Sequence, residues 1–148
     1  MSTYTQILYQ IVFSTWKREH TLNANNREAL FKYIWGIVKN KNCHLYQIGG
    51  VSDHLHIVTH IHPAISLASL VKDIKLASSG FIKDNKIFPS FAGWQTGYSA
   101  FTYSIKEKER LINYVKNQES HHKKTTFVNE LVVFLKEHGI EYNEKYLD

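Results

Sequence analysis

The chain has 148 residues, 43% hydrophobic and 21% charged, with a formal net charge of +5 and a pI near 9.2. This length and composition predict one domain over residues 1–148 and exclude a low-complexity protein. No apolar run approaches the roughly 20 residues needed to cross a bilayer, so we expect no membrane partner. The basic balance suits a polyanion such as nucleic acid, although many basic proteins bind none.

Cys43 is the only cysteine, which excludes an internal disulfide and a cysteine-rich zinc site. The first 16 residues show no basic start followed by an apolar stretch, so no secretory signal is expected. Both features favour a cytoplasmic location.

Three strands and one helix are predicted in the N-terminal part of the chain. Alternating apolar residues predict a strand over 5–14, and helical spacing predicts a helix over about 26–40, with asparagine 25 or 26 as its N-cap. Strands over 43–48 and 53–61 follow, and the Gly-Gly-Val-Ser link between them favours antiparallel pairing.

One further strand and three helices are predicted after that. A helix capped by Ser66 should run to about residue 83, and an irregular segment at 88–97 leads to a strand over 98–103. Ser104 and Glu107 have capping-box spacing, which predicts a helix to about residue 120. The last helix should begin at residue 125 or 126 and end near 138.

This order of elements is the split pattern of α+β domains with a ferredoxin-like (RRM-like) fold. It predicts an antiparallel sheet with helices packed on one face, plus C-terminal helices, and a second sheet face left free for a ligand. Fold alone says nothing about chemistry.

The stretch Asp53-His54-Leu55-His56 carries the first chemical signal. On a strand, His54 and His56 point to the same side, so their imidazoles could chelate one divalent ion, oriented by Asp53 or a backbone carbonyl. His60 and His62 continue the alternation, however, so the same pattern also fits a solvated histidine-rich sheet face.

Tyr114 and Gln118 lie four residues apart and therefore share one face of the predicted third helix. A phenol with a pKa near 10 is a poor nucleophile unless a metal or another cation stabilises its anion. Beside a metal, Tyr114 could attack a phosphate and the Gln118 amide oxygen could complete the ligand set. Taken alone, a helical tyrosine is more often a packed aromatic residue with its hydroxyl at the surface, so neither residue by itself indicates an active site.

Several ordered motifs together resemble the single-tyrosine HUH transposases, namely TnpA-type enzymes of insertion sequences and REP-associated tyrosine transposases. The resemblance spans nearly the whole chain. It is carried by Ile11–Thr15, Gly50–His56, Ser66–Lys72, Trp94–Phe101, Tyr114–His122 and His138–Tyr142.

The resemblance implies a role for each matching residue. His54 and His56 correspond to the histidine pair of the HUH motif, Gln118 to the third metal ligand and Tyr114 to the nucleophile. It implies that Mg²⁺ or Mn²⁺ activates the scissile phosphate, and that the tyrosine forms a 5′-phosphotyrosine link and releases a 3′-hydroxyl. Reversal of this step would rejoin strands.

The resemblance also implies the partners. Single-stranded DNA with hairpin ends would be the substrate, and a homodimer could share active sites through exchange of the tyrosine helix. Lys72, Lys75 and Lys116 are candidates for phosphate contacts, and each fits a solvated surface charge at least as well.

Two other functions fit parts of the pattern. A histidine-triad nucleotide hydrolase also uses alternating strand histidines, but Val58 occupies the position where it would need the third. A domesticated, non-catalytic nucleic-acid-binding module could keep the same fold. His121 and His122 are expected to cap helix carbonyls and not to act as ligands.

Overall fold

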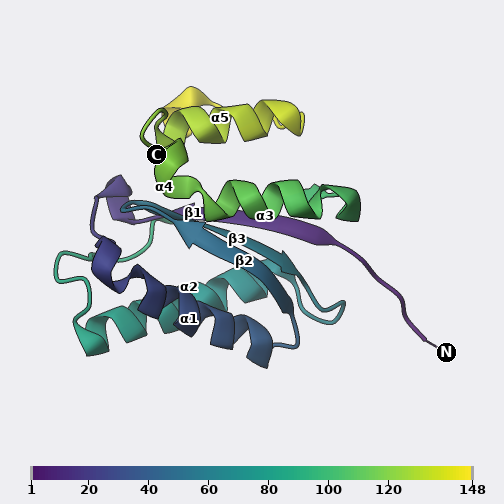
Figure 1. The fold of residues 1–148 in the computed structure, drawn as a ribbon, viewed down its shortest axis with the longest axis horizontal. Coiled ribbons are helices and arrows are strands. Elements are labelled where there is room, and N and C mark those ends of the chain that lie inside the picture. Colours follow the sequence, from purple (N-terminus) through teal and green to yellow (C-terminus); the bar gives the residue numbers. More distant parts are fainter. Residues whose placement is uncertain (1, 148) are drawn as a thin grey trace.

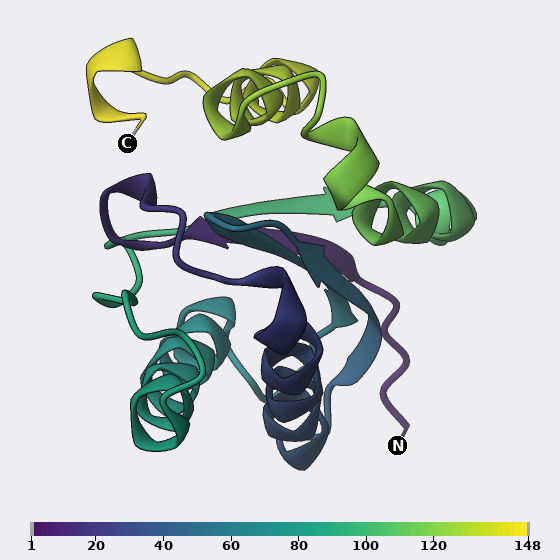
Figure 2. The same cartoon turned by 60° about the vertical axis from the view of Figure 1, so that its left-hand side comes forward.

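A computed structural model describes residues 2–147 as one four-stranded antiparallel sheet between two helical layers (Figures 1 and 2). The strand order β2-β3-β1-β4 is that of a ferredoxin-like sheet, as the sequence predicts. The main elements are β1 (Leu8–Ser14), α1 (Ala24–Asn40), β2 (His44–Gly50), β3 (His54–His60), α2 (Leu67–Asn85), β4 (Ser99–Tyr103), α3 (Lys108–Lys116), α4 (Gln118–His121) and α5 (Phe127–Glu137). Three short 3-10 segments complete the description: η1 (Trp16–Arg18), η2 (Ile105–Glu107) and η3 (Glu144–Tyr146).

One face of the sheet forms the main apolar core against α1 and α2. Ile11 and Phe13 of β1 and Leu55 and Ile57 of β3 point into this layer and are at most 2% exposed. The apolar stripes of the two helices cover these strand residues. The alternating apolar side chains of the strands and the apolar faces of α1 and α2 therefore form one core.

The other face is not free, contrary to the expectation from the sequence. Helices α3, α4 and α5 lie over it, as Figure 2 shows clearly. Their apolar side chains need burial, and they find it on Leu8, Val12 and Val58, the residues that alternate with the main core positions. A ligand would therefore have to act between the sheet and this second helical layer.

Helix α3 packs unusually close to β2 because Gly49 has no side chain. A Cβ at this position would lie 2.2 Å from the carbonyl oxygen of Val115, so any other residue would force the helix away. Gly49 pairs with His56 across the sheet. The close approach therefore fixes the distance between the tyrosine helix and the histidine strand.

Most predicted helix caps are confirmed, and one is wrong. Ser66 accepts a hydrogen bond from the Ser69 amide, and Ser104 and Glu107 form the reciprocal capping box. Helix α1, however, begins at Ala24 with Asn23 as N-cap. The Asn26 side chain instead donates to the carbonyl of Ile87, a tertiary bond that the local sequence does not reveal.

The predicted continuous helix up to residue 120 is broken at Asn117. This residue has φ −101° and ψ 27°, which separates α3 from α4. Asparagine tolerates such a conformation because its side chain competes with the helix hydrogen bonds. The break redirects the chain so that α4 turns back toward the site. Among residues 2–147, no helix is long and apolar enough to cross a membrane.

Candidate active site

His54 and His56 of β3 are completely buried, and hydrogen bonds fix the orientation of each ring. The Nδ1–H of His54 donates to the Asp53 carboxylate at 2.7 Å, and that of His56 donates to the side-chain carbonyl of Gln10 at 2.7 Å. The Gln10 amide nitrogen in turn donates to the Tyr103 hydroxyl at 2.8 Å, which fixes the orientation of the amide. Both imidazoles therefore direct Nε2 to the same region.

That region is occupied by the carboxylate of Glu130, a residue that the sequence analysis missed. Its Oε1 lies 2.9 Å from Nε2 of His56 and 3.3 Å from Nε2 of His54. Gln118, 1% exposed, places its Oε1 3.3 Å from His54 Nε2 and its amide nitrogen 3.3 Å from Glu130 Oε2. The structure therefore brings Gln118 to the histidine pair.

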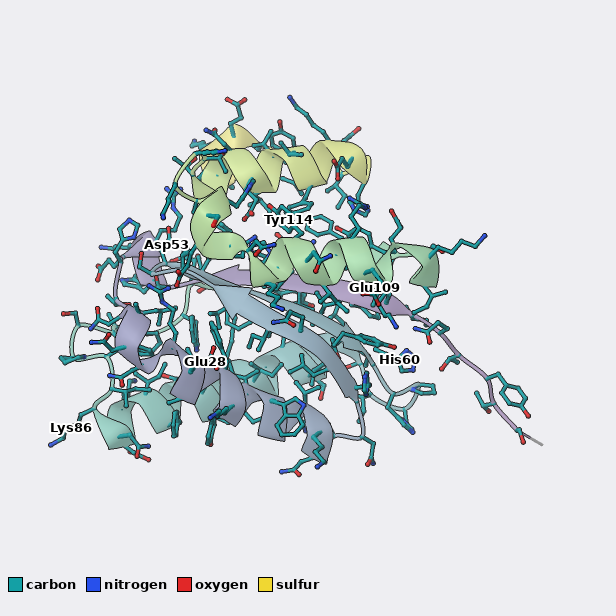
Figure 3. All side chains as sticks on the ribbon, viewed as in Figure 1. Glu28, Asp53, His60, Lys86, Glu109 and Tyr114 are labelled. Atoms are coloured by element: carbon teal, nitrogen blue, oxygen red, sulfur yellow. The ribbon has the colours of Figure 1, made fainter. Side chains whose placement is uncertain are left out.

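Tyr114 reaches the same carboxylate from α3. Its hydroxyl donates a short hydrogen bond to Glu130 Oε2 and lies 3.0 Å from His121 Nε2. Its ring centroid is 6.0 Å from that of His56. Figure 3 shows Tyr114 between α3 and α5, while His60 lies at the far end of β3 from Asp53 and outside this cluster.

Glu130 is buried because it lies on the apolar face of α5. Phe127, Leu131 and Phe134 occupy the same helical face and pack on the sheet, so Glu130 is carried inward and is only 4% exposed. A glutamate interrupting a phenylalanine and leucine stripe is a signal that could have revealed it. A carboxylate buried in this way needs charged or hydrogen-bonding partners.

His122, directly after α4, also reaches the cluster. Its Nδ1–H donates to the carbonyl of Thr125 at 2.9 Å, which agrees with the expected capping. Its Nε2 is buried, lacks a hydrogen-bond partner, and lies 3.2 Å from Glu130 Oε2. The imidazole therefore belongs to the site and is not confined to the end of a helix.

The cluster is electrostatically coupled. Burial alone would raise the pKa of Glu130, but hydrogen bonds from the surrounding imidazoles outweigh it and hold that pKa well below its usual range. Burial likewise opposes the charged form of His54, yet Asp53 and Glu130 raise its pKa. Burial dominates at His56 and lowers its pKa to about 4.

Tyr114 is held in its neutral form in this arrangement. Burial raises the pKa of its phenol, and the neighbouring Glu130 carboxylate raises it further. A nucleophilic phenolate therefore needs positive charge added to the cluster.

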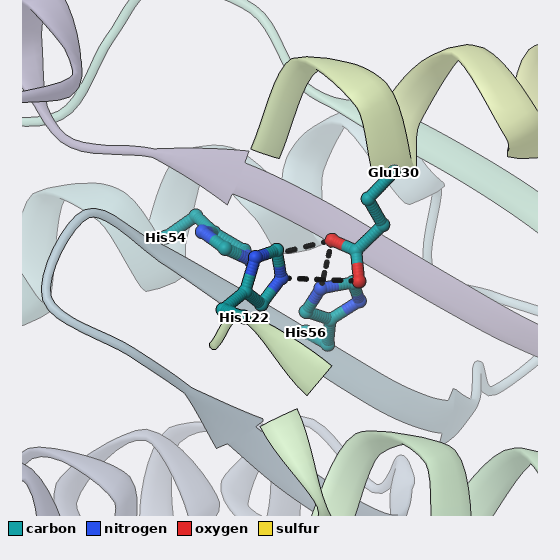
Figure 4. A group of neighbouring side chains, drawn as sticks. All are labelled: His54, His56, His122 and Glu130. Atoms are coloured by element: carbon teal, nitrogen blue, oxygen red, sulfur yellow. Dashed lines mark hydrogen bonds and ion pairs between the residues drawn. The ribbon is translucent and has the colours of Figure 1, made fainter. Parts of the chain in front are cut away.

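The donor set fits a divalent metal ion. Ligand atoms of His54, His56, His122 and Glu130 all lie within 4.8 Å of one another (Figure 4). Ligands about 2.1 Å from a tetrahedral ion are separated by roughly 3.4 Å, so only small shifts are needed. The Nε2 of His122 contacts Glu130 without a well-aligned hydrogen bond, and such an ion would satisfy it.

Residues 3–118 match the family model described as IS200-like transposase. The chain belongs to the IS200-like transposase family. This confirms the resemblance drawn from the sequence motifs. The matched region ends at Gln118, so the segment that supplies His122 and Glu130 to this transposase lies beyond it. No curated protein matches the sequence.

Two solved structures share the fold of the transposase. A candidate transposase of Deinococcus radiodurans R1 is 20% identical with a TM-score of 0.62, and the alignment covers 80% of this chain and 95% of the other. A REP-associated tyrosine transposase bound to a REP hairpin is 14% identical with a TM-score of 0.59, covering 82% of this chain and 74% of the other. At these identities the similarity establishes the fold.

A cleft of about 710 Å³ opens beside the histidine cluster of the transposase. Asp53 and His122 line it next to the site, and exposed Lys17 and Lys123 add positive charge. Arg27 also lines it but pairs with Glu119 at 3.1 Å. The cleft thus joins a cationic surface to the buried cluster.

The three lysines proposed for DNA contact are in different places. Lys72 is exposed on α2, which covers the sheet face opposite the site. Lys75 is half-buried and donates to the carbonyls of Gln95 and Gly97, a structural role. Lys116 is exposed at the end of α3, on the same side of the sheet as the cluster. Only Lys116 lies on the element that carries Tyr114.

Proposed function

We propose that this chain is a divalent-metal-dependent transposase that cleaves and rejoins single-stranded hairpin DNA through Tyr114. The observation that carries the proposal is the convergence of Tyr114 and Gln118, from the tyrosine helix and its continuation, on the histidine pair of β3. We assign Tyr114 as nucleophile and His54, His56 and Gln118 as ligands of Mg²⁺ or Mn²⁺.

The proposed reaction is the one that the family resemblance implies. The Tyr114 oxygen bonds to the scissile phosphorus, the bond from phosphorus to the 3′-oxygen breaks, and that oxygen leaves as a hydroxyl after taking up a proton. Because the phosphotyrosine keeps the energy of the broken phosphodiester, a 3′-hydroxyl can attack it and rejoin the strand without ATP. A bound divalent cation supplies the positive charge that offsets Glu130 and polarises the phosphate.

The remaining groups orient these participants. Asp53 and Gln10 fix the two imidazoles with Nε2 directed inward, and the sheet holds both in register. The packing of α3 on Gly49 holds the phenol near them. Such preorganisation favours a reaction that requires in-line alignment of three atoms.

The test is covalent capture of DNA labelled on the fragment downstream of the break. We expect the wild-type protein with Mn²⁺ and a single-stranded hairpin to form an adduct that resists denaturation, and the Tyr114→Phe variant to form none while it still binds the hairpin. Binding without an adduct by the wild-type protein would assign the chain to the alternative class, a domesticated nucleic-acid-binding module.

We further propose that single-stranded DNA lies in this cleft and enters the site from it. Lys17 and Lys123 lie along it, and His122 lies where it meets the cluster. Phosphate contacts dominate the affinity of such surfaces, so binding should weaken steeply as salt concentration rises. A flat response to salt would contradict this path.

We also propose that the protein acts as a homodimer in which each tyrosine helix serves its own subunit. The homodimer is what the family resemblance implies, and the tight contact of α3 with Gly49 within one chain supports the arrangement in which each helix serves its own subunit. Mixing Tyr114→Phe protein with His56→Ala protein distinguishes the two arrangements. We expect no adduct from the mixture, whereas a restored adduct would show that the helix serves the neighbouring subunit.

A further inference from the structure

The segment after the matched family region adds donors to the site. The match ends at Gln118, yet His122 follows α4 and Glu130 lies on α5, and both side chains return to the histidine pair. Figure 4 shows the Glu130 carboxylate beside the imidazoles of His54, His56 and His122, with a dashed line from it to each ring. The cluster is thus built from two parts of the chain, the shared transposase core and the segment beyond it.

Three imidazoles of the cluster are anchored in the same way. Each uses its Nδ1–H on a separate oxygen acceptor: the Asp53 carboxylate for His54, the Gln10 side-chain carbonyl for His56 and the Thr125 backbone carbonyl for His122. In the neutral form each therefore presents an Nε2 lone pair to the interior. Histidines that bind metal ions are commonly held in this way, with the other ring N–H donated to an oxygen acceptor.

The three Nε2 atoms face a negatively charged group. Glu130 oxygens lie 3.3 Å from His54 Nε2, 2.9 Å from His56 Nε2 and 3.2 Å from His122 Nε2. Lone pairs and a carboxylate at these separations require positive charge between them, which either protons or a metal ion can provide. A metal ion satisfies all four groups at once, including the His122 nitrogen that has no hydrogen-bond partner.

We propose that Glu130 and His122 are metal ligands, so that the segment after residue 118 adds one imidazole nitrogen and one carboxylate oxygen to the site of His54, His56 and Gln118. This rests on the proposed function, because it concerns the same metal. The donor set selects a first-row transition ion such as Mn²⁺ over Mg²⁺, which prefers oxygen ligands and keeps several waters.

The experiment measures Mn²⁺ binding without DNA, by the loss of the free-ion EPR signal and by calorimetry. We expect Glu130→Gln, which keeps the size of the side chain, and His122→Ala each to weaken binding by at least roughly tenfold. Glu137→Gln, an exposed glutamate on the same helix, is the matched control and should bind as the wild type does. Circular dichroism and thermal melts in chelator establish that each variant is folded.

A second measurement reports on the ligands directly. Co²⁺ bound to the wild-type protein should give the intense visible bands of a four- or five-coordinate ion, and Glu130→Gln should weaken them. Unchanged Mn²⁺ affinity in both variants would overturn the proposal. Tighter binding in Glu130→Gln would also overturn it, because the carboxylate would then be a competitor of the ion.

The outcome is separable from that of the proposed function. Loss of Mn²⁺ affinity in the variants supports the added ligands even if the wild-type protein forms no covalent adduct with DNA. An adduct formed by a wild-type protein whose Glu130→Gln variant binds Mn²⁺ normally would retain the transposase assignment and remove Glu130 from the ligand set.

Discussion

The two faces of the sheet bury different kinds of side chain, although the same strands build both. Toward α1 and α2, β3 presents Leu55 and Ile57 to a purely apolar layer. Toward α3 to α5 it presents His54 and His56, which are equally buried but lie among hydrogen-bonded polar groups. A step of one residue along the strand therefore changes the environment from core to candidate active site.

Because of this difference, residues on one face of β3 contribute mainly to folding stability, and residues on the other face contribute mainly to ion binding. Burial of apolar area stabilises the first face and does not require a bound ion. The second face holds charges inside the protein, and its energy depends on which positive charges accompany Glu130. Substitutions at adjacent positions should therefore have effects of different kinds.

The largest effect on folding should come from Leu55→Ala. Leu55 is fully buried, so its truncation should lower the free energy of unfolding by about 3 kcal/mol, measured by urea denaturation in chelator. The rise in melting temperature on adding Mn²⁺ should remain. His56→Gln should remove that rise while destabilising the chelated protein less. Equal behaviour of the two variants would contradict the division between the faces.

The next effect tests the contact between Gly49 of β2 and Val115 of α3. Gly49→Ala should push α3 from β2, because the new methyl group would meet the Val115 carbonyl, and should reduce adduct formation at least tenfold. The free energy of unfolding should fall by roughly 1–3 kcal/mol.

The matched control for this substitution is Gly80→Ala in α2. No atom lies within 4 Å of a Cβ built at Gly80, so alanine there should stabilise the protein by roughly 0.5–1 kcal/mol and leave the adduct yield unchanged. A Gly49→Ala variant with normal adduct yield would show that the spacing of α3 does not matter.

The fold and half of the candidate site could be predicted from local patterns. The strand alternation placed His54 and His56 on one face. Gln118 also reaches the site, but from α4 and not from the helix that carries Tyr114, because the predicted helix breaks at Asn117. Glu130 and His122 were missed because their approach depends on how α5 docks on the sheet and on the break at Asn117. Neither is encoded in the spacing of a few residues.

The smallest effects concern surface charge. Lys123→Gln and Lys17→Gln, both beside the cleft, should each weaken hairpin binding a few-fold and reduce the salt dependence by about one counterion. Lys72→Gln, on the helical layer that covers the opposite face, should change affinity less than about twofold. Fluorescence anisotropy over a range of salt concentrations measures both. A stronger effect at Lys72 would indicate that the single-stranded DNA binds the opposite side of the molecule.

The break at Asn117 lies one residue before the end of the matched family region. The histidine pair belongs to the sheet before this break, whereas Gln118, His122 and Glu130 come after it. A change in the backbone angles of this one residue would therefore move three of the proposed ligands together and leave the other two in place.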